Sequence, residues 1–407
     1  RYTMRGTMMD FPLTLTHLFD RAERLFPRKE IVTNSPTGRQ RISYGAWAER
    51  TRRLGTVLDD LGISADGRVA TFAWNTSRHL ELYFAAPCSG RVCHTLNLRL
   101  FPEQLVYIVN HAEDEVIFVD NSLAKLLWPA LETFTTVRHV VVMNDTGGDL
   151  PTEAPNGIQV HDYETLLAAA APREWDIPDE NLAAAMMYTS GTTGPPKGVM
   201  ISNANVMFVA EATRDLMPFD EARGKKVISY LPMAHIAERT VSHYSQVVLG
   251  YEVSCCPEPS MIATYLAGVR PNIIFGVPRV WEKIYSGVTA ALSADEEKKR
   301  QVDEAVAAAI PIVEKITWGT ATDEEKETYA FLDAVAFSTI RQLIGLDELD
   351  LAVDLEEGRT GELRWGVGIS TGQGAQASIT YIKRNFDLWN PPSSANPVTA
   401  ISEMLDN

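Results

Sequence analysis

Apolar residues in the first part of the chain recur with the spacings of alternating helices and strands. Between residues 15 and 26 they fall three and four positions apart, which places them on one face of a helix. Residues 115–120 and 138–143 hold short apolar runs, as expected of parallel strands that are covered on both faces. Further helices are predicted over 43–61, 79–86 and 102–111, with strands over 68–73 and 92–96 and a hairpin over 31–44. This alternation predicts an α/β domain with helices on both faces of its sheet.

The later part of the chain shows a second α/β pattern that gives way to helices. Strands are predicted over 226–231 and 272–277, and an almost wholly helical stretch over 286–346. Within that stretch, Ser293 with Glu296 and Thr322 with Glu325 have the spacing of capping boxes. We therefore expect a first α/β subdomain over 1–180 and a second over 181–353, with a helical insertion at about 286–346. Residues 354–407 form an atypical tail of unknown fold.

Composition and charge narrow the class of protein. The chain has 407 residues, 45% of them hydrophobic, and a formal net charge of −16. Such an acidic chain is a poor partner for nucleic acid or for an anionic membrane. The four cysteines, Cys88, Cys93, Cys255 and Cys256, lack the spacing of metal ligands and are expected to be buried free thiols. No apolar run reaches the roughly 18 residues that span a bilayer. We expect a cytoplasmic protein, with peripheral membrane contact left open.

Residues 188–199 carry the strongest chemical signal. They follow the apolar run 183–187 and read Tyr-Thr-Ser-Gly-Thr-Thr-Gly-Pro-Pro-Lys-Gly-Val. Hydroxyl groups can donate hydrogen bonds, glycines let the backbone approach a ligand closely, and Lys197 adds a positive charge. This combination suits the phosphates of a nucleotide, because backbone N–H groups and a cation share the negative charge. The order of residues is not that of the common G-x-x-x-x-G-K-[ST] phosphate loop.

This segment resembles the signature loop of the adenylate-forming superfamily, which includes acyl-CoA synthetases, peptide-synthetase adenylation domains and luciferases. Residues 91–104, 110–114, 118–120, 230–239 and 276–283 resemble fatty acyl-CoA synthetases. The likeness runs from about residue 5 to about residue 353. Residues before 199 resemble medium-chain enzymes more, and residues 201–353 long-chain enzymes, so a mosaic gene is a further hypothesis.

The resemblance implies a fold and an activity. The fold would be the large N-terminal domain of the adenylate-forming fold, with mixed and parallel sheets flanked by helices, and without the C-terminal subdomain. The activity would be ATP-dependent activation of a medium- or long-chain fatty acid to acyl-adenylate and then to acyl-CoA. Its cofactors would be ATP, Mg²⁺ and coenzyme A, the last as a co-substrate.

The resemblance also implies roles for individual residues. Lys197 and Thr193 would be catalytic, and Thr193 would help to bind Mg²⁺, which favours oxygen ligands. His235, Gly276, Val277 and Pro278 would line the acyl site. The nucleotide phosphates would be held by Thr189, Ser190, Gly191, Thr192, Thr193, Gly194 and Lys197.

Other histidines and one charged pair have simpler interpretations. His94 and His111 are expected to be structural, and Glu238 and Arg239 to form a local ion pair.

The sequence departs from the family after residue 353. The adenine-binding segment, the Thr-Glu motif, the ribose-binding aspartate and the catalytic-lysine subdomain are not found there. Three alternatives to a working fatty acid ligase therefore stay open. The chain could be a catalytically impaired relative that binds nucleotide or acyl chains, a ligase for another carboxylic acid, or a non-functional mosaic fragment.

Overall fold

The computed structural model describes residues 11–35, 38–189, 194–216, 224–347, 349, 351–357, 363–367 and 381–382, with backbone alone from 351 on. The chain divides into two compact units, which we describe separately. The first comprises Arg1–Gly224 with Tyr230–Glu258, and the second Lys225–Ser229 with Pro259–Asn407. The expected boundary near residue 180 differs from this division, because two strands after it extend the sheet of the first unit.

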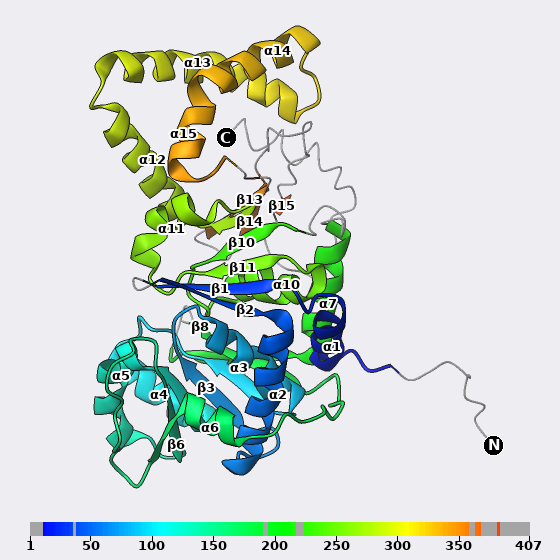
Figure 1. Ribbon diagram of the computed structural model, residues 1–407, viewed down its shortest axis with the longest axis vertical. Helices are drawn as coiled ribbons and strands as arrows, with labels where there is room; N and C mark the ends of the chain where they lie inside the picture. Colours follow the sequence, from blue (N-terminus) through cyan, green and yellow to red (C-terminus); the bar gives the residue numbers. More distant parts are fainter. Residues whose placement is uncertain are drawn as a thin grey trace, which may run out of the picture. The chain divides into compact units, whose positions relative to one another are not determined.

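The first unit is built on a seven-stranded sheet in the order β7-β6-β5-β3-β4-β8-β9 (Figure 1). All neighbouring strands are parallel except β8 and β9, which form an antiparallel hairpin. The strands are β3 (Arg68–Phe72), β4 (Val92–Thr95), β5 (Asp114–Asp120), β6 (His139–Met143), β7 (Gln159–Asp162), β8 (Ala183–Thr189) and β9 (Lys197–Ser202).

Helices cover both faces of this sheet, as the alternating pattern predicts. Ile117 and Val119 of β5 belong to a core cluster with Leu105 and Leu123, which lie on α4 (Pro102–Ala112) and α5 (Asn121–Leu127). Successive strand residues point to opposite faces, so Phe118 turns the other way. Its ring packs edge-on against Tyr163 of α6 (Tyr163–Ala169), with centroids 6.1 Å apart. On the face of Phe118 lie α2 (Tyr44–Asp60) and α3 (Ser77–Cys88). A 3-10 helix, η1 (Trp128–Thr133), follows α5.

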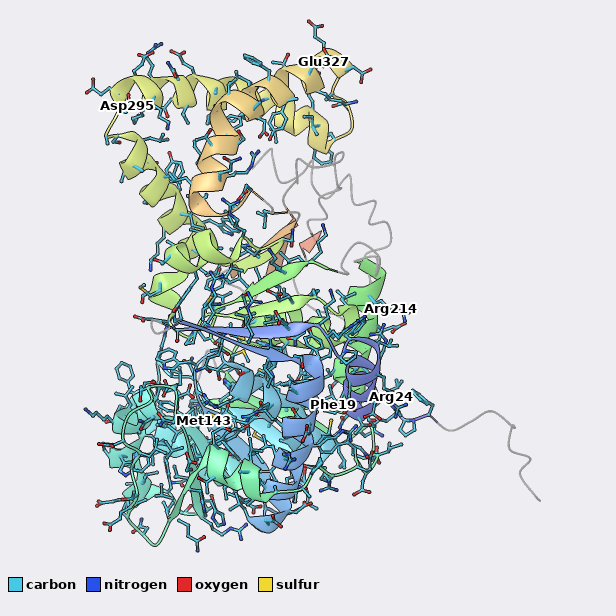
Figure 2. All side chains as sticks on the ribbon, in the orientation of Figure 1. Phe19, Arg24, Met143, Arg214, Asp295 and Glu327 are labelled. Carbon is cyan, nitrogen blue, oxygen red and sulfur yellow. The ribbon has the colours of Figure 1, made fainter. Side chains whose placement is uncertain are left out.

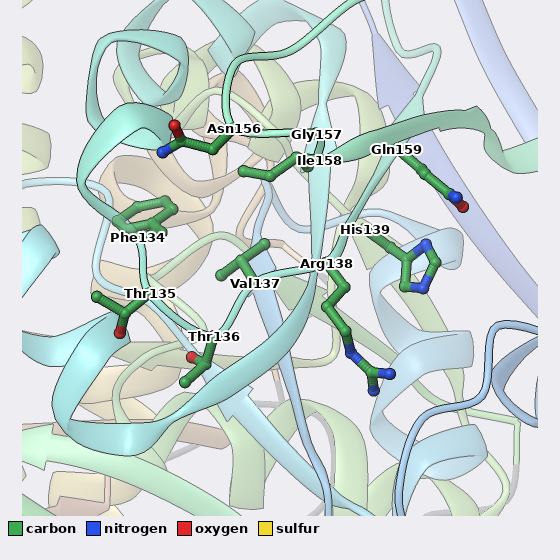
Figure 3. Close-up of a pocket in the computed structure, with 10 residues that line it drawn as sticks. All are labelled: Phe134, Thr135, Thr136, Val137, Arg138, His139, Asn156, Gly157, Ile158 and Gln159. Carbon is green, nitrogen blue, oxygen red and sulfur yellow. The ribbon is translucent and has the colours of Figure 1, made fainter.

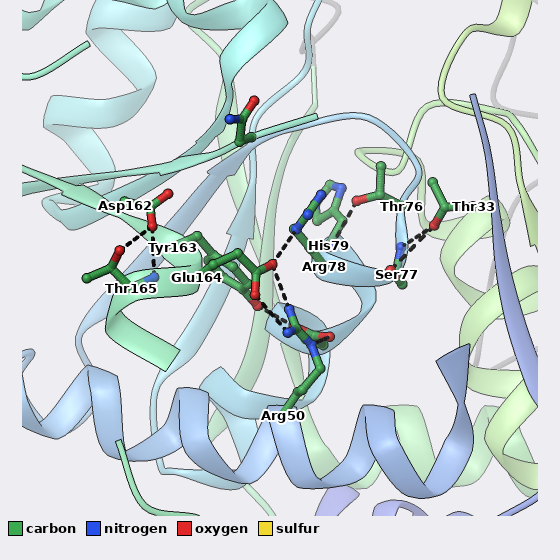
Figure 4. A network of polar contacts seen from close by, with 12 residues as sticks. Thr33, Arg50, Thr76, Ser77, Arg78, His79, Asp162, Tyr163, Glu164 and Thr165 are labelled. Atoms are coloured by element: carbon green, nitrogen blue, oxygen red, sulfur yellow. Dashed lines mark hydrogen bonds and ion pairs between the residues drawn. The ribbon is translucent and has the colours of Figure 1, made fainter. Parts of the chain in front are cut away.

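An ion-pair network ties three of these helices together. Arg50 of α2 bonds Glu81 of α3 at 2.7 Å and Glu164 of α6 at 2.8 Å, and Arg78 bonds Glu164 at 2.9 Å (Figure 4). Glu81 is fully buried, so Arg50 and the Tyr163 hydroxyl offset the cost of burying its charge. We assign this network to the stability of the fold.

The first unit also holds a three-stranded group formed by β1 (Glu30–Ser35), β2 (Gly38–Ser43) and β11 (Glu252–Cys255). β1 and β2 are the predicted hairpin, and β11 pairs with β1 in parallel. Phe19 of α1 (Leu15–Leu25) is buried beside this unit's helices, whereas Arg24 lies at the surface (Figure 2). The other helices are α7 (Asn203–Leu216), α9 (Ile236–Glu238), the π-helix η2 (Arg239–Tyr244) and α10 (Ser245–Leu249).

The second unit carries the order β15-β14-β13-β12-β10. β10 (Lys226–Ser229), β12 (Ile273–Gly276) and β13 (Leu351–Glu357) are parallel, and β14 (Leu363–Val367) and β15 (Tyr381–Ile382) follow antiparallel. The predicted helical stretch is confirmed. It comprises α12 (Pro278–Leu292), α13 (Glu296–Thr317), α14 (Asp323–Leu332), η4 (Asp333–Phe337) and α15 (Ser338–Ile344), preceded by η3 (Pro259–Met261) and α11 (Ile262–Val269).

Only one of the two predicted capping boxes forms. The Thr322 hydroxyl accepts from the Glu325 N–H at 3.2 Å, and the Glu325 carboxylate accepts from the Thr322 N–H at 2.9 Å. The prediction for Ser293 was wrong, because Asp295 caps α13 instead. The Ser293 hydroxyl donates back to the Thr289 carbonyl at the end of α12.

Candidate functional site

The segment predicted to hold phosphates joins β8 to β9. Thr189 is the last residue of β8, Lys197 is the first of β9, and the two face each other in the hairpin register. Ser190, Gly191, Thr192 and Thr193 lie outside the described residues, so the roles predicted for them, including Mg²⁺ binding by Thr193, stay predictions. The structure describes the residues on either side of them.

Two glycines of this segment have a structural reason. Gly194 has φ +94°, a conformation that side-chain-bearing residues rarely adopt, and a Cβ there would meet open space. Gly198 lies opposite Tyr188, and a Cβ on it would be 3.2 Å from the ring carbon that carries the hydroxyl. Gly194 therefore permits the turn, whereas Gly198 leaves room for the Tyr188 ring.

Lys197 is exposed at the start of β9. Its ammonium group forms no ion pair with any residue that the structure describes. A lysine without a counter-ion beside a left-handed glycine turn fits an anionic ligand such as a phosphate. The described part of the segment thus suits the nucleotide that the sequence predicts.

Tyr188 is held by histidines for which the sequence predicted only structural roles. His111 Nδ1 lies 2.6 Å from the Tyr188 hydroxyl. The His94 ring packs against Tyr188 with centroids 5.2 Å apart, and His94 Nδ1 lies 2.8 and 2.9 Å from the two oxygens of Asp114. Sequence reasoning missed this group, because nothing in the spacing of these residues shows that three strands and a helix bring them together.

His235 lies at the N-terminus of α9, and its side chain is exposed. The segment before it is anchored to α3, since Tyr83 donates to the Met233 carbonyl at 3.1 Å. Asn75 likewise donates to the Leu231 carbonyl at 2.9 Å. The structure therefore presents His235 at the end of a fixed segment, which leaves its imidazole available for a ligand.

Gly276, Val277 and Pro278 belong to the second unit. Gly276 ends β12, and a Cβ on it would lie 2.6 Å from the indole nitrogen of Trp281. Val277 caps α12 and Pro278 opens it, where a missing N–H costs nothing. Gly276 thus has a packing reason for its residue type, and the predicted role of all three positions at the acyl site stays a prediction.

The predicted pair of Glu238 with Arg239 was wrong. Arg239 is fully buried, and its guanidinium carbon lies 3.9 Å from the centre of the Tyr83 ring and 5.6 Å from that of Tyr244. None of its side-chain nitrogens has a hydrogen-bond partner among the described residues. Adjacent helical residues point in different directions, so neighbours in sequence do not meet.

The cysteine thiols and a surface hollow are two further features that a functional site could use, and neither joins the predicted site. The four cysteines are free and buried, as predicted, and burial raises the pKa of each thiol. An open hollow of about 470 Å³ is lined by residues 134–139 and 156–159 (Figure 3). None of the predicted site residues lines it, and its Arg138 is engaged by Glu115.

Two further kinds of site are absent from the described part of the chain. No cluster of three or more histidine, cysteine, aspartate or glutamate residues there is arranged to hold a metal ion. No helix within the same residues has the length and apolar character to cross a membrane.

Known proteins resemble this chain over most of its length. It is 35% identical to a 3-methylmercaptopropionyl-CoA ligase of Ruegeria lacuscaerulensis over 74% of the chain and 56% of the relative. It is 30% identical to the medium-chain-fatty-acid–CoA ligase of Ectopseudomonas oleovorans, over 74% and 55%. It is 36% identical to the long-chain-fatty-acid–CoA ligase of Thermus thermophilus, over 68% and 50%. The chain thus spans about half the length of these relatives.

A solved structure shares the fold. The ATP-bound MatB of Rhodopseudomonas palustris aligns with a TM-score of 0.54 and 25% identity, over 67% of this chain and 51% of that one. This likeness confirms the predicted fold class, the N-terminal domain of adenylate-forming CoA ligases. The sequence profile described as AMP-binding enzyme matches residues 19–357. The chain belongs to the AMP-binding enzyme family.

Proposed function

We propose that this chain serves the ATP-dependent activation of a medium- or long-chain fatty acid to its CoA thioester. A carboxylate oxygen attacks the α-phosphorus of ATP, the bond to pyrophosphate breaks, and acyl-adenylate forms. The CoA thiol then attacks the acyl carbon and releases AMP. The observation that carries the proposal is the β8–β9 hairpin, where exposed Lys197 stands beside the left-handed turn at Gly194.

The hairpin residues would act mainly through charge and position. Lys197 would neutralise phosphate oxygens and favour the departure of pyrophosphate, as fixed cations do in phosphoryl chemistry. Thr189 and Gly194 would contribute a hydroxyl and a close backbone approach. Ser190, Gly191, Thr192 and Thr193 complete the proposed loop, and Thr193 would help to hold Mg²⁺ when the metal is bound.

His235, which is exposed at the start of α9, would contact the acid. Relatives named for fatty acids support a fatty acid. A relative named for 3-methylmercaptopropionate supports the alternative of another, shorter acid. We also propose a cytoplasmic location, in which peripheral contact with membranes would give access to fatty acids.

A second candidate function is binding without turnover. It is motivated by the sequence after residue 353, where the adenine-binding segment and the Thr-Glu motif of the family are not found. Such a relative would bind nucleotide or acyl chains and release no product.

Acid-dependent exchange between ATP and pyrophosphate distinguishes these functions. The purified chain is assayed with Mg²⁺ and saturated acids from three to eighteen carbons. Exchange that requires the acid and is largest with long chains is the expected result, and a maximum at three or four carbons would instead favour the short-acid alternative. Nucleotide binding without any exchange would reject the ligase function and leave the binding function.

A further inference from the structure

Tyr188 is surrounded by polar side chains from three other elements. His111 comes from α4, His94 from β4 and Asp114 from the start of β5. His111 bonds the tyrosine hydroxyl at 2.6 Å, and the His94 ring lies against the tyrosine ring. We call Tyr188, His111, His94 and Asp114 the tyrosine clamp.

The two inner residues of the tyrosine clamp, His94 and Asp114, cost free energy to bury. His94 and Asp114 are both fully buried, and His94 Nε2 has no hydrogen-bond partner among the described residues. Burial raises the pKa of Asp114, while the charge and hydrogen bond of His94 oppose that rise. An apolar pair of similar size would fill this place at less cost. Buried polar networks of this kind make a structure rigid and unique, which is useful where a neighbouring group must be held in place.

The outer half of the tyrosine clamp acts on the hairpin. Partial burial, with the nearby Asp114 and Tyr107, raises the pKa of Tyr188 to about 12. The phenol therefore stays protonated at neutral pH and can donate to the His111 nitrogen. On its other side the ring meets Gly198, which has no side chain to displace it. The ring is thus confined between the two histidines and β9.

The confined ring lies next to the residues of the proposed phosphate site. Thr189 follows Tyr188 on β8, and its partner Lys197 precedes Gly198 on β9. A displacement of Tyr188 would disturb both residues, because Tyr188 pairs with Gly198 in the same hairpin in which Thr189 pairs with Lys197.

We propose that His111, His94 and Asp114 are positioning residues that fix Tyr188, and through it hold Thr189 and Lys197 in place for the phosphates of ATP. This inference rests on the proposed function, because it assigns the hairpin to a nucleotide.

Removal of single groups tests the tyrosine clamp. Tyr188→Phe removes only the hydroxyl, and His111→Ala removes its partner at an exposed position, where the core stays intact. Tyr107→Phe is the matched control, since Tyr107 stacks on the same His111 ring with centroids 5.2 Å apart. Asp114→Asn keeps the size of the buried side chain and removes its charge.

Two readouts are compared across these variants. In ATP–pyrophosphate exchange, Tyr188→Phe and His111→Ala should each lower kcat/KM for ATP by about tenfold, the worth of one hydrogen bond. Tyr107→Phe should leave kcat/KM for ATP unchanged, and each variant should still unfold in one cooperative thermal transition. In amide hydrogen exchange, the backbone of β8 and β9 should exchange faster in Tyr188→Phe, His111→Ala and Asp114→Asn, while other strands keep their rates.

The two readouts separate failure of this inference from failure of the proposed function. A wild-type chain that shows no ATP–pyrophosphate exchange rejects the proposed function. Amide hydrogen exchange of β8 and β9 then tests the tyrosine clamp independently of that function. If the hairpin exchanges no faster in Tyr188→Phe and His111→Ala than in Tyr107→Phe, the inference is overturned. Equal kcat/KM values in these three variants of an active protein would overturn it as well.

Discussion

At the scale of the residue, Gly194 illustrates how the proposed phosphate turn constrains the chain. Its φ of +94° is strained for any residue with a Cβ, whatever space surrounds it. Gly194→Ala should therefore lower the free energy of unfolding by about 1–2 kcal/mol. Gly287 lies inside α12, where a Cβ would also meet open space. Gly287→Ala should raise stability by roughly 0.5–1 kcal/mol. Urea unfolding measures both, and a loss of equal size in the two variants would contradict the conformational explanation.

Arg239 provides a second test at this scale. A buried charge without an ionic partner costs several kcal/mol, whereas a cation–π contact returns about 2 kcal/mol. Arg239→Met should therefore raise the free energy of unfolding, by about 1–3 kcal/mol.

The matched control for Arg239 is Arg52, which is also largely buried but bonds Glu23 at 2.7 Å and Asp20 at 2.9 Å. Arg52→Met should lower stability, because Glu23 loses its ion-pair partner and Asp20 keeps only the 3.9 Å contact with Arg24. Thermal unfolding of both variants gives the comparison. A destabilised Arg239→Met protein would show that the guanidinium stabilises the fold and would contradict this prediction.

At the scale of the element, two helix N-termini show that a capping-box sequence does not always form the cap. Thr322 and Glu325 bond each other reciprocally at the start of α14, while Ser293 does not cap α13. Thr322→Ala should cost about 1 kcal/mol, and Ser293→Ala should cost much less. Chemical denaturation distinguishes them, and equal losses would mean that the cap at Thr322 adds nothing to stability.

The hairpin of β8 and β9 is the element on which the function depends. Its antiparallel pairing brings Lys197 back beside Thr189, although eight positions of sequence separate them. The rest of the sheet is parallel, so the hairpin turns the chain at the edge of the sheet. A cation and a hydroxyl are thereby presented together on a paired strand end.

At the scale of the whole molecule, buried histidines couple stability to pH. Burial lowers the pKa of His79 to about 3, although its hydrogen bond to the Trp74 carbonyl opposes that shift. Burial also lowers the pKa of His243, with a further contribution from His79 and Arg239. Below about pH 6.5 these two imidazoles therefore bind protons in the unfolded chain but stay neutral in the folded chain. The free energy of unfolding consequently falls as the pH is lowered towards 3.

This linkage is measurable as a slope. His79→Gln should make stability between pH 6.5 and 4.5 less dependent on pH, by up to about 1.4 kcal/mol per unit. Urea unfolding at several pH values gives the slopes of both proteins. Identical slopes would show that His79 does not stay neutral in the folded chain.

The sequence predicted the regular parts of the molecule better than its long-range contacts. Periodic apolar residues identified the alternating helices and strands of the first sheet and the helices after residue 286, because local spacing determines which face is buried. Local spacing cannot show that Arg239 meets Tyr83 or that His94 meets Asp114, since tertiary folding alone brings those pairs together. The loop was found by its composition, yet the histidines that hold its tyrosine were not.

The most direct test of the central claim is the binding of Mg·ATP to the phosphate hairpin, measured by titration calorimetry. Wild type, Lys197→Ala and Lys125→Ala are compared, because Lys125 is an exposed lysine of the same unit that lies on α5, away from the hairpin. Binding should weaken at least tenfold in Lys197→Ala, as loss of a charged contact implies, and should be unchanged in Lys125→Ala. Equal affinities in all three proteins, or no binding to folded wild type, would contradict the claim.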